Sequence, residues 1–113
     1  MLRLTLMMIA LATPVAAQER ISTRDQFVSR VADRQLSRVG IGVTVTQDGR
    51  ISGSAFGTGV TGSWDWSGAF FCRKMEWGSR SWDRSCQAVQ IDGDRVYFIG
   101  DKGRGSQVYL NLP

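Results

Sequence analysis

Few residues in this sequence have side chains that could carry out chemistry, and their types narrow the options. The chain of 113 residues contains two cysteines, Cys72 and Cys86, and no histidine. A hydrolytic triad pairs its nucleophile with a general base that is most often histidine, so enzymes of that class are excluded. Two cysteines without a histidine also cannot complete a zinc site. We therefore expect no catalytic residue, no metal site and a protein that is not an enzyme.

A glycine-rich motif raises the question of a nucleotide cofactor. Residues 57–62 match G-x-G-x-x-G, the fingerprint of dinucleotide-binding domains. That fingerprint works only where a strand turns into a helix whose N-terminus faces the pyrophosphate. Here the glycines precede Trp64 and Trp66 in a pattern typical of a strand. We therefore expect no cofactor.

Aromatic and basic side chains gather around a predicted hairpin tip at residues 78–80. Trp and Arg dominate the hot spots of protein interfaces, which favours a recognition patch. Arg also stacks over indole rings on ordinary surfaces, which favours simple packing. Both interpretations stay open on sequence alone. The candidate recognition patch consists of Trp77, Trp82, Arg73, Arg80 and Arg84.

The N-terminus predicts the compartment. Arg3 precedes a short apolar run, and small residues at Val15 and Ala17 are placed for signal peptidase, so residues 1–17 are interpreted as a signal peptide. The apolar segment is shorter than the roughly 20 residues that span a bilayer. Cleavage after Ala17 predicts a periplasmic or secreted protein that does not span the membrane.

Residues 18–113 are then expected to form a single domain with a core of marginal size. An even number of cysteines in an oxidising compartment predicts that Cys72 and Cys86 form a disulfide. Closing that loop contributes about 3 kcal/mol in the chain-entropy description. The formal net charge of +4 is only mildly basic, so we expect no nucleic-acid partner.

The pattern of apolar residues predicts one helix followed by strands. Residues 22–36 fit an amphipathic helix, with Ser22 and Asp25 as a capping box and Phe27 on the apolar face. From Leu36 onward the period changes to two and glycines separate short runs, which indicates antiparallel strands. Strands are predicted near 37–46, 50–57, 60–66, 69–77, 84–91, 95–100 and 106–112.

These elements predict a mainly β fold: an N-terminal helix that packs on or caps a six- to eight-stranded antiparallel meander, which closes partly or fully into a small barrel. Glycines within the strands allow the bends that such a barrel needs. Residues 62–64 match the short G-x-W element of lipocalin-type barrels, so the expected barrel is lipocalin-like. We expect Trp64 and Trp66, which share one side of their strand, to fill the core.

The first hairpin can be placed in register. A three-residue loop at 47–49, with its glycine left-handed, pairs Val45 with Ile51 and Ile41 with Ala55. This register collects the apolar residues on one face, whereas a two-residue turn would mix the faces.

The second predicted hairpin contains both cysteines. If its loop is symmetric about Ser79, positions whose numbers sum to 158 face each other, and Cys72 and Cys86 are such a pair. The predicted disulfide is therefore a bridge between neighbouring strands.

The spaced Trp, Cys and Gly positions resemble a group of small exported bacterial proteins whose members often carry the product name dihydrodipicolinate reductase. That name would imply an oxidoreductase. The true reductase is a nicotinamide-dependent enzyme with a Rossmann domain, for which a small exported β domain has no room. We interpret the name as inherited, and no catalytic residue is carried over. The segments that resemble the group are 48–53, 61–66, 71–73, 77–78, 86–87 and 100–105.

The sequence thus favours a non-enzymatic binding module or a structural component of the envelope. Its expected partner is a small apolar ligand in the barrel or a periplasmic protein at the Trp-rich hairpin. The alternatives are an inhibitor of a periplasmic hydrolase and the oxidoreductase that the name implies. A large apolar void in the barrel would favour a small ligand, and a filled core with an exposed Trp and Arg patch would favour a protein.

Overall fold

The computed structural model describes residues 18–113, so the predicted signal peptide at residues 1–17 lies outside the described residues. Two short helices, α1 (Arg24–Arg30) and α2 (Gly100–Gly103), occur in this part of the chain, together with nine strands. The strands are β1 (Glu19–Ile21), β2 (Gln35–Arg38), β3 (Ile41–Val45), β4 (Arg50–Ala55), β5 (Thr58–Ser67), β6 (Phe70–Trp77), β7 (Arg80–Asp92), β8 (Arg95–Ile99) and β9 (Gln107–Asn111).

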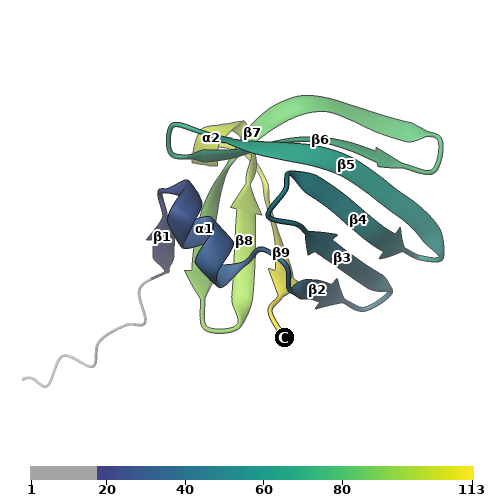
Figure 1. Ribbon diagram of the computed structural model, residues 1–113, viewed down its shortest axis with the longest axis horizontal. Coiled ribbons are helices and arrows are strands. Elements are labelled where there is room, and N and C mark those ends of the chain that lie inside the picture. Colours follow the sequence, from purple (N-terminus) through teal and green to yellow (C-terminus); the bar gives the residue numbers. More distant parts are fainter. Residues whose placement is uncertain (1–17) are drawn as a thin grey trace, which may run out of the picture.

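Strands β2 to β9 form a closed antiparallel barrel (Figure 1). Each strand pairs with the next along the chain, and β9 pairs with β2 where Ser37 lies opposite Asn111. The remaining strand, β1, pairs with β7 just beyond the start of β6, with Ile21 opposite Val89. The predicted antiparallel barrel is therefore confirmed, and of the six to eight strands expected, partly or fully closed, the ring has eight and is closed.

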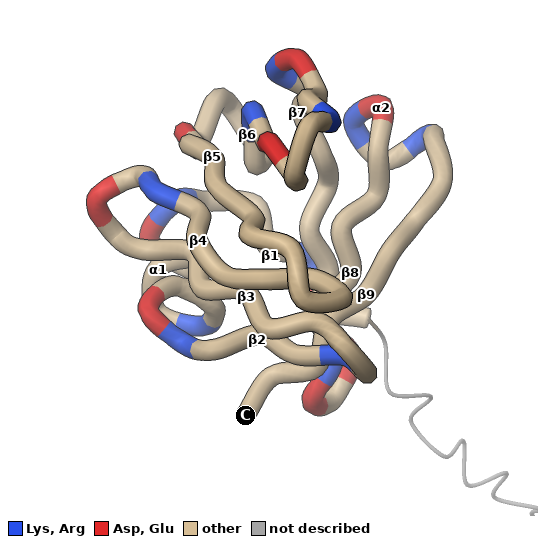
Figure 2. Tube along the Cα trace, turned by 90° about the vertical axis from the view of Figure 1, so that its right-hand side faces the viewer, with Lys and Arg blue, Asp and Glu red and all other residues tan. Residues whose placement is uncertain are grey.

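Charged residues concentrate at the turns of this barrel rather than along its walls. Figure 2 shows most of the coloured positions at hairpin ends, while the strands between them are largely uncoloured. Strand interiors must bury one face, which leaves the turns as the natural place for solvated charges.

The helix is shorter than the predicted span of residues 22–36. α1 ends at Arg30, and Leu36 lies fully buried in β2 instead. Asp33, with a φ of 62°, turns the chain between the two elements, and its backbone N–H donates to the carbonyl O of Val45. An apolar residue such as Leu36 fits the inner face of either element, so periodicity alone extended the helix too far.

The helix cap is also displaced by one residue from the prediction. The N-cap is Thr23, not Ser22, and the Thr23 side chain accepts a hydrogen bond of 3.2 Å from the backbone N–H of Gln26. The Gln26 side chain in turn accepts a hydrogen bond of 2.9 Å from the backbone N–H of Ser22. Gln26 therefore fills the role that the sequence assigned to Asp25.

Two strand predictions need correction. The single strand expected over residues 37–46 is two strands, β2 and β3, because Val39 and Gly40 form a tight turn in which Gly40 has a φ of 77°. Val39 is 95% exposed there, although a β-branched residue favours strands. β7 is longer than the predicted 84–91, and β1 was not predicted.

The first hairpin has the predicted register. Val45 lies opposite Ile51 and Ile41 opposite Ala55, with Gly49 in the left-handed region at a φ of 94°. Trp64 fixes this loop from the next strand, because its indole N–H donates to the carbonyl O of Thr46 at 2.8 Å. The apolar side of β3 and β4 therefore faces the barrel interior, as the sequence indicated.

In the second hairpin, the structure confirms the predicted disulfide but not the symmetric loop from which it was inferred. Cys72 lies directly opposite Cys86, yet Trp77 pairs with Arg80, so the turn contains two residues and is not symmetric about Ser79. A β-bulge corrects the register: Lys74 of β6 lies opposite two residues of β7. The short turn and the bulge each shift the pairing by one residue, and the shifts cancel at the cysteines.

The core is densest at the end of the barrel where α1 lies. The ring of Phe27 from α1 packs 5.1 Å from Trp64, 5.4 Å from Trp66 and 5.0 Å from Phe71, measured between ring centroids. The ring of Phe98 from β8 lies 5.4 Å from that of Phe71. The prediction that both tryptophans fill the core is confirmed for Trp64, whereas Trp66 is partly buried and packs against the core.

Glycines allow the sheet to bend where neighbouring backbones come close. A Cβ atom at Gly53 would lie 2.0 Å from the carbonyl O of Gly42, and one at Gly62 would lie 2.3 Å from the carbonyl O of Lys74. No side chain fits either position without displacing the backbone. Gly53 and Gly62 thus permit the tight curvature of a small barrel.

Candidate functional site: the barrel cavity

The barrel contains a cavity of about 470 Å³. This volume is typical of pockets that bind small molecules, which range from about 300 to 1,000 Å³. Nearly all of the side chains that line it are aliphatic or aromatic and lie at inward-facing positions of the strands. They include Leu36, Ile41, Val43, Val45, Ile51, Val60, Phe71, Met75, Phe98 and Leu110.

The two ends of the cavity differ. Phe27 and the aromatic rings around it block the end near α1. At the opposite end, apolar side chains at the rim face solvent, with Phe56 68% exposed, Val108 58% and Trp82 38%. A second hollow of about 450 Å³ continues outward from this rim past Val39. The cavity therefore has one mouth and one aromatic floor.

The residues of the candidate recognition patch divide between the cavity and the outer surface. Trp77, Trp82 and Arg73 line the cavity. The guanidinium of Arg80 lies over the Trp77 ring, 5.9 Å from its centroid. Arg84 lies on the outer face of the same hairpin. The structure therefore brings Trp77, Trp82 and Arg80 together at the mouth and separates Arg84 from them.

Arg73 is the most unusual of these residues, because its side chain enters the apolar interior. Its Nη1 atom is buried and has no hydrogen-bond partner among residues 18–113. Burial lowers the pKa of its guanidinium from the ordinary value, since the charged form loses hydration. An arginine nevertheless keeps its proton in proteins. The cavity thus contains a positive charge that is partly desolvated.

Few polar side chains accompany Arg73 in the cavity. Gln87 is buried on β7, at the position diagonally adjacent to Arg73 across the β6–β7 ladder. Arg38 lies at the rim with its guanidinium 4.0 Å from the centroid of the Tyr109 ring. None of the lining residues in the described part of the chain is acidic.

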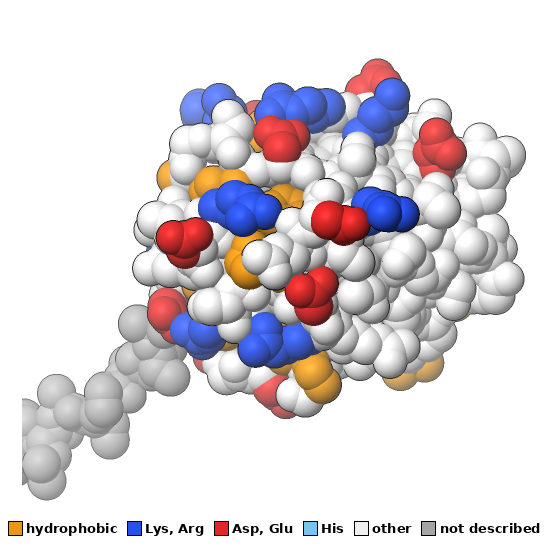
Figure 3. Space-filling model, in the orientation of Figure 1, with side chains coloured by type: hydrophobic (Ala, Val, Ile, Leu, Met, Phe, Trp, Pro, Cys, Tyr) orange, Lys and Arg blue, Asp and Glu red, His pale blue; other side chains and the backbone are white. Residues whose placement is uncertain are grey.

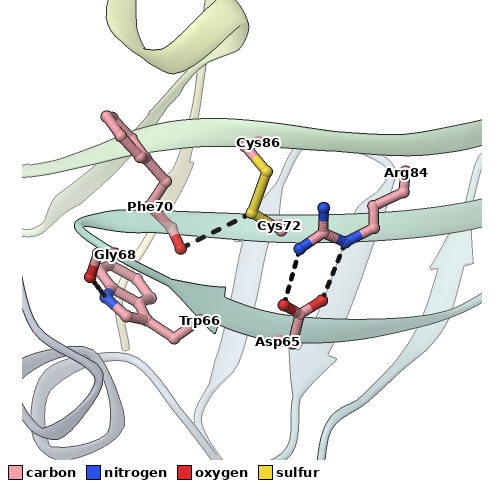
Figure 4. The surroundings of a disulfide bond; sticks show 7 residues. All are labelled: Asp65, Trp66, Gly68, Phe70, Cys72, Arg84 and Cys86. Carbon is pink, nitrogen blue, oxygen red and sulfur yellow. Dashed lines mark hydrogen bonds and ion pairs between the residues drawn. A yellow bond between two sulfur atoms is a disulfide. The ribbon is translucent and has the colours of Figure 1, made fainter.

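The outer face of the hairpin carries the disulfide and an ion pair (Figure 4). The Cα atoms of Cys72 and Cys86 are 4.0 Å apart, and Cys72 is fully buried. The guanidinium of Arg84 donates to both carboxylate oxygens of Asp65, at 2.9 and 3.3 Å. These hydrogen bonds lower the pKa of Asp65 and raise that of Arg84.

The glycine-rich motif does not occupy the strand-to-helix turn of a nucleotide site. The glycine-rich segment 57–62 forms the β4–β5 turn and the start of β5, so a strand rather than a helix follows it. Within residues 18–113, no three His, Cys, Asp or Glu side chains come close enough to hold a metal ion. In the same range, neither helix has the length and hydropathy needed to cross a bilayer.

The surface around the barrel offers no continuous charged region on the face that Figure 3 shows. Basic and acidic side chains alternate there, with small apolar areas between them. Interspersed charges of both signs are typical of a solvated surface. The mouth and the cavity are therefore more distinctive than this face.

Sequence reasoning missed the mouth residues Phe56 and Val108 and the interior role of Arg73. A signal for Arg73 was present: it alternates with Phe71, Met75 and Trp77 along one strand, so it shares their inward face. Phe56 carried no comparable signal, because it lies in a turn with a φ of 52°.

Comparisons of the chain with known proteins found no match. No protein-family model matches the chain, and neither the curated proteins nor the solved structures that were compared with it include a match. The functional proposal below therefore rests on the fold and the cavity.

Proposed function

We propose that this protein is a non-enzymatic binding module that holds a small apolar ligand inside its barrel. The observation that carries the proposal is the apolar cavity of about 470 Å³. Barrels of about eight strands are just wide enough for side chains to fill them, so folding alone does not require a void of this size. A binding function explains why this interior is hollow.

The energetics support the same conclusion. Protein interiors are packed as densely as organic crystals, and an unfilled cavity lowers stability in proportion to its volume. An engineered apolar cavity of about 150 Å³ already binds benzene. A ligand that fills a larger apolar cavity regains contacts that the empty barrel lacks.

The proposal includes export to the periplasm or the outside of the cell. Two features support it: the signal-like residues 1–17 of the sequence, and the bond between Cys72 and Cys86, which is compatible with an oxidising compartment. The resemblance to small exported bacterial proteins agrees with this location.

Binding of a neutral, environment-sensitive dye such as Nile red tests the proposed function. The purified protein, extracted free of lipid, should bind the dye saturably at micromolar concentration with a blue-shifted emission. Ala55 faces the cavity near its mouth, so Ala55→Phe should fill part of it and weaken binding about tenfold or more. Ser54→Phe, which adds the same ring to the adjacent exposed position, is the matched control and should bind as the wild type does.

Two results would contradict the proposal. One is the absence of saturable dye binding by folded wild-type protein. The other is native mass spectrometry of the protein from its own cells that shows a stoichiometric complex with a hydrolase and no small molecule. Saturable binding of a nicotinamide cofactor at micromolar concentration, followed by tryptophan fluorescence, would instead support the reductase name.

A further inference from the structure

We infer that the ligand is an amphipathic monoanion, a long-chain carboxylate, and that Arg73 binds its head group inside the barrel. The alkyl tail then extends from Arg73 along the apolar wall toward the mouth. This inference deepens the proposed function and rests on it.

The first argument is the unsatisfied charge at Arg73. Its Nη1 atom is buried without a hydrogen-bond partner in the described part of the chain. Burying a cation without a partner is costly, and proteins ordinarily pair such groups. No acidic residue lines the cavity to provide that pair. The missing partner is therefore an anion that enters from outside.

The second argument concerns the position of Arg73 in the cavity. Along β6, the inward-facing residues run from Phe71 at the aromatic floor through Arg73 and Met75 to Trp77 at the mouth. Trp77 lies four positions beyond Arg73 along the strand, a distance of about 13 Å at the usual rise per residue. A head group at Arg73 thus lies deep in the barrel, and an alkyl chain fits the apolar path above it.

The third argument selects a carboxylate over other anions. The planar guanidinium donates two parallel hydrogen bonds that match a carboxylate, and it supplies a single positive charge. A dianionic phosphate would bring a second negative charge into the apolar interior without compensation. The side-chain amide of Gln87, on the adjacent inner position, is within reach as a further donor.

The rim arginine, Arg38, is the competing anchor. Its guanidinium already lies 4.0 Å from the centroid of the Tyr109 ring and faces the solvent at the mouth. A cation that is hydrated and stacked on an aromatic ring has less need of an anion than a buried one. The geometry therefore favours the head group at Arg73 over a reversed arrangement with the head group at the mouth.

Competition between two ligands of equal chain length tests this inference. Hexadecanoate and hexadecan-1-ol are each titrated at pH 8, below their aggregation limits, against Nile red bound to the lipid-free protein. Hydrogen bonds to a charged group predict that the carboxylate displaces the dye at a concentration about tenfold lower or more. In Arg73→Met the two ligands should compete equally. Arg84→Met, on the outer face of the same hairpin, should keep the wild-type preference.

A melting experiment on the lipid-free variants shows whether Arg73 has a structural partner. Removing an unpaired buried charge should leave the melting temperature of Arg73→Met equal to or above that of the wild type. A clearly lower melting temperature would mean that Arg73 holds the fold together, and would overturn the inference. Arg73→Gln provides the same binding test with a polar side chain if the methionine variant does not fold.

The outcomes separate this inference from the proposed function. Equal displacement by hexadecanoate and hexadecan-1-ol in the wild type would overturn the carboxylate but leave an apolar ligand in place. A preference that persists in Arg73→Met and disappears in Arg38→Met would place the head group at the mouth, contrary to the inference. If the dye itself does not bind saturably to the folded wild type, both proposals fail.

Discussion

The two ends of the barrel are built from the same kinds of residues but use them differently. At the end covered by α1, Phe27 is fully buried among the rings of Trp64, Trp66 and Phe71. At the mouth, Phe56 stands mostly in solvent near Trp77, with ring centroids 6.4 Å apart. The aromatic residues of one end fill space, whereas those of the other surround it.

This difference separates what folding requires from what it does not. A buried aromatic cluster contributes apolar burial and close packing to stability. Exposed apolar rings at the rim of a cavity contribute little to folding and are a common mark of a binding site. The closed end therefore contributes more to the stability of this small domain than the open end, which the proposed ligand would contact.

The largest expected effect comes from truncating one phenylalanine at each end. Phe27→Ala should lower the free energy of unfolding by about 3–5 kcal/mol, because it leaves a cavity in the aromatic cluster. Phe56→Ala should change it by no more than about 0.5 kcal/mol, since that ring is mostly solvated. Denaturant unfolding followed by circular dichroism measures both. Equal losses at the two positions would remove the distinction between the ends.

Removal of the disulfide tests whether β6 and β7, beside the aromatic floor, need a covalent link for stability. Replacing both Cys72 and Cys86 by Ala should lower the free energy of unfolding by about 2–4 kcal/mol. For a domain of this size the melting temperature should fall by roughly 10–25 °C. The β-type circular dichroism spectrum should persist under mild conditions. A double variant that melts with the wild type would show that the wall holds without the bond.

At the mouth, stability and binding should respond separately to mutation. Trp82→Ala should change the free energy of unfolding by less than about 1 kcal/mol, because the indole is substantially exposed. The same variant should bind Nile red about fivefold more weakly, as loss of roughly 1 kcal/mol of aromatic contact implies. Unchanged dye affinity would exclude Trp82 from the binding surface.

The smallest effect is expected from the exposed ion pair outside the barrel. The hydrogen bonds from Arg84 lower the pKa of Asp65, so the Asp65 carboxyl group binds a proton less tightly in the folded protein than in the unfolded chain. The pair therefore stabilises the protein above the unfolded pKa of about 3.9, and this contribution disappears as the pH falls through the lower folded pKa. Because both side chains are exposed to solvent, the contribution should be small.

A comparison of the wild type with Asp65→Asn at several pH values measures this contribution. The variant should be slightly less stable at pH 6, and the difference should disappear as the pH falls through the lowered pKa of Asp65. The opposite trend, a difference that grows as the pH falls, would contradict the assigned role of Arg84.

The sequence predicted the features that depend on local patterns. Alternating apolar residues and glycine turns indicated the antiparallel barrel, and the loop ending at Gly49 fixed the register of Val45 with Ile51. The cysteine pairing was also correct, although it depended on a symmetric loop that the structure does not contain. A bulge elsewhere in the hairpin is a tertiary adjustment that residue spacing does not reveal.

Features that depend on how elements meet in space could not be predicted in this way. Leu36 suits the inner face of a helix or a strand, so the boundary between α1 and β2 depended on the turn at Asp33. The size of the cavity depends on how much of the barrel interior the side chains fill, and the periodicity of the sequence does not show this. Arg73 was grouped with Arg80 and Arg84 by proximity in sequence, although its alternation with Phe71 and Met75 along β6 directs it inside.

The pairing of β9 with β2 has a consequence for how the chain folds. All other neighbours in the ring are consecutive hairpins, but this seam joins Ser37 to Asn111, near the two ends of the barrel sequence. Contacts between distant residues carry the largest loop-closure entropy and form slowly. Until the seam forms, β2 and β9 are open edges that can pair with another chain. We therefore expect loss of the last strand to yield molecules that self-associate through exposed edges rather than smaller folded barrels.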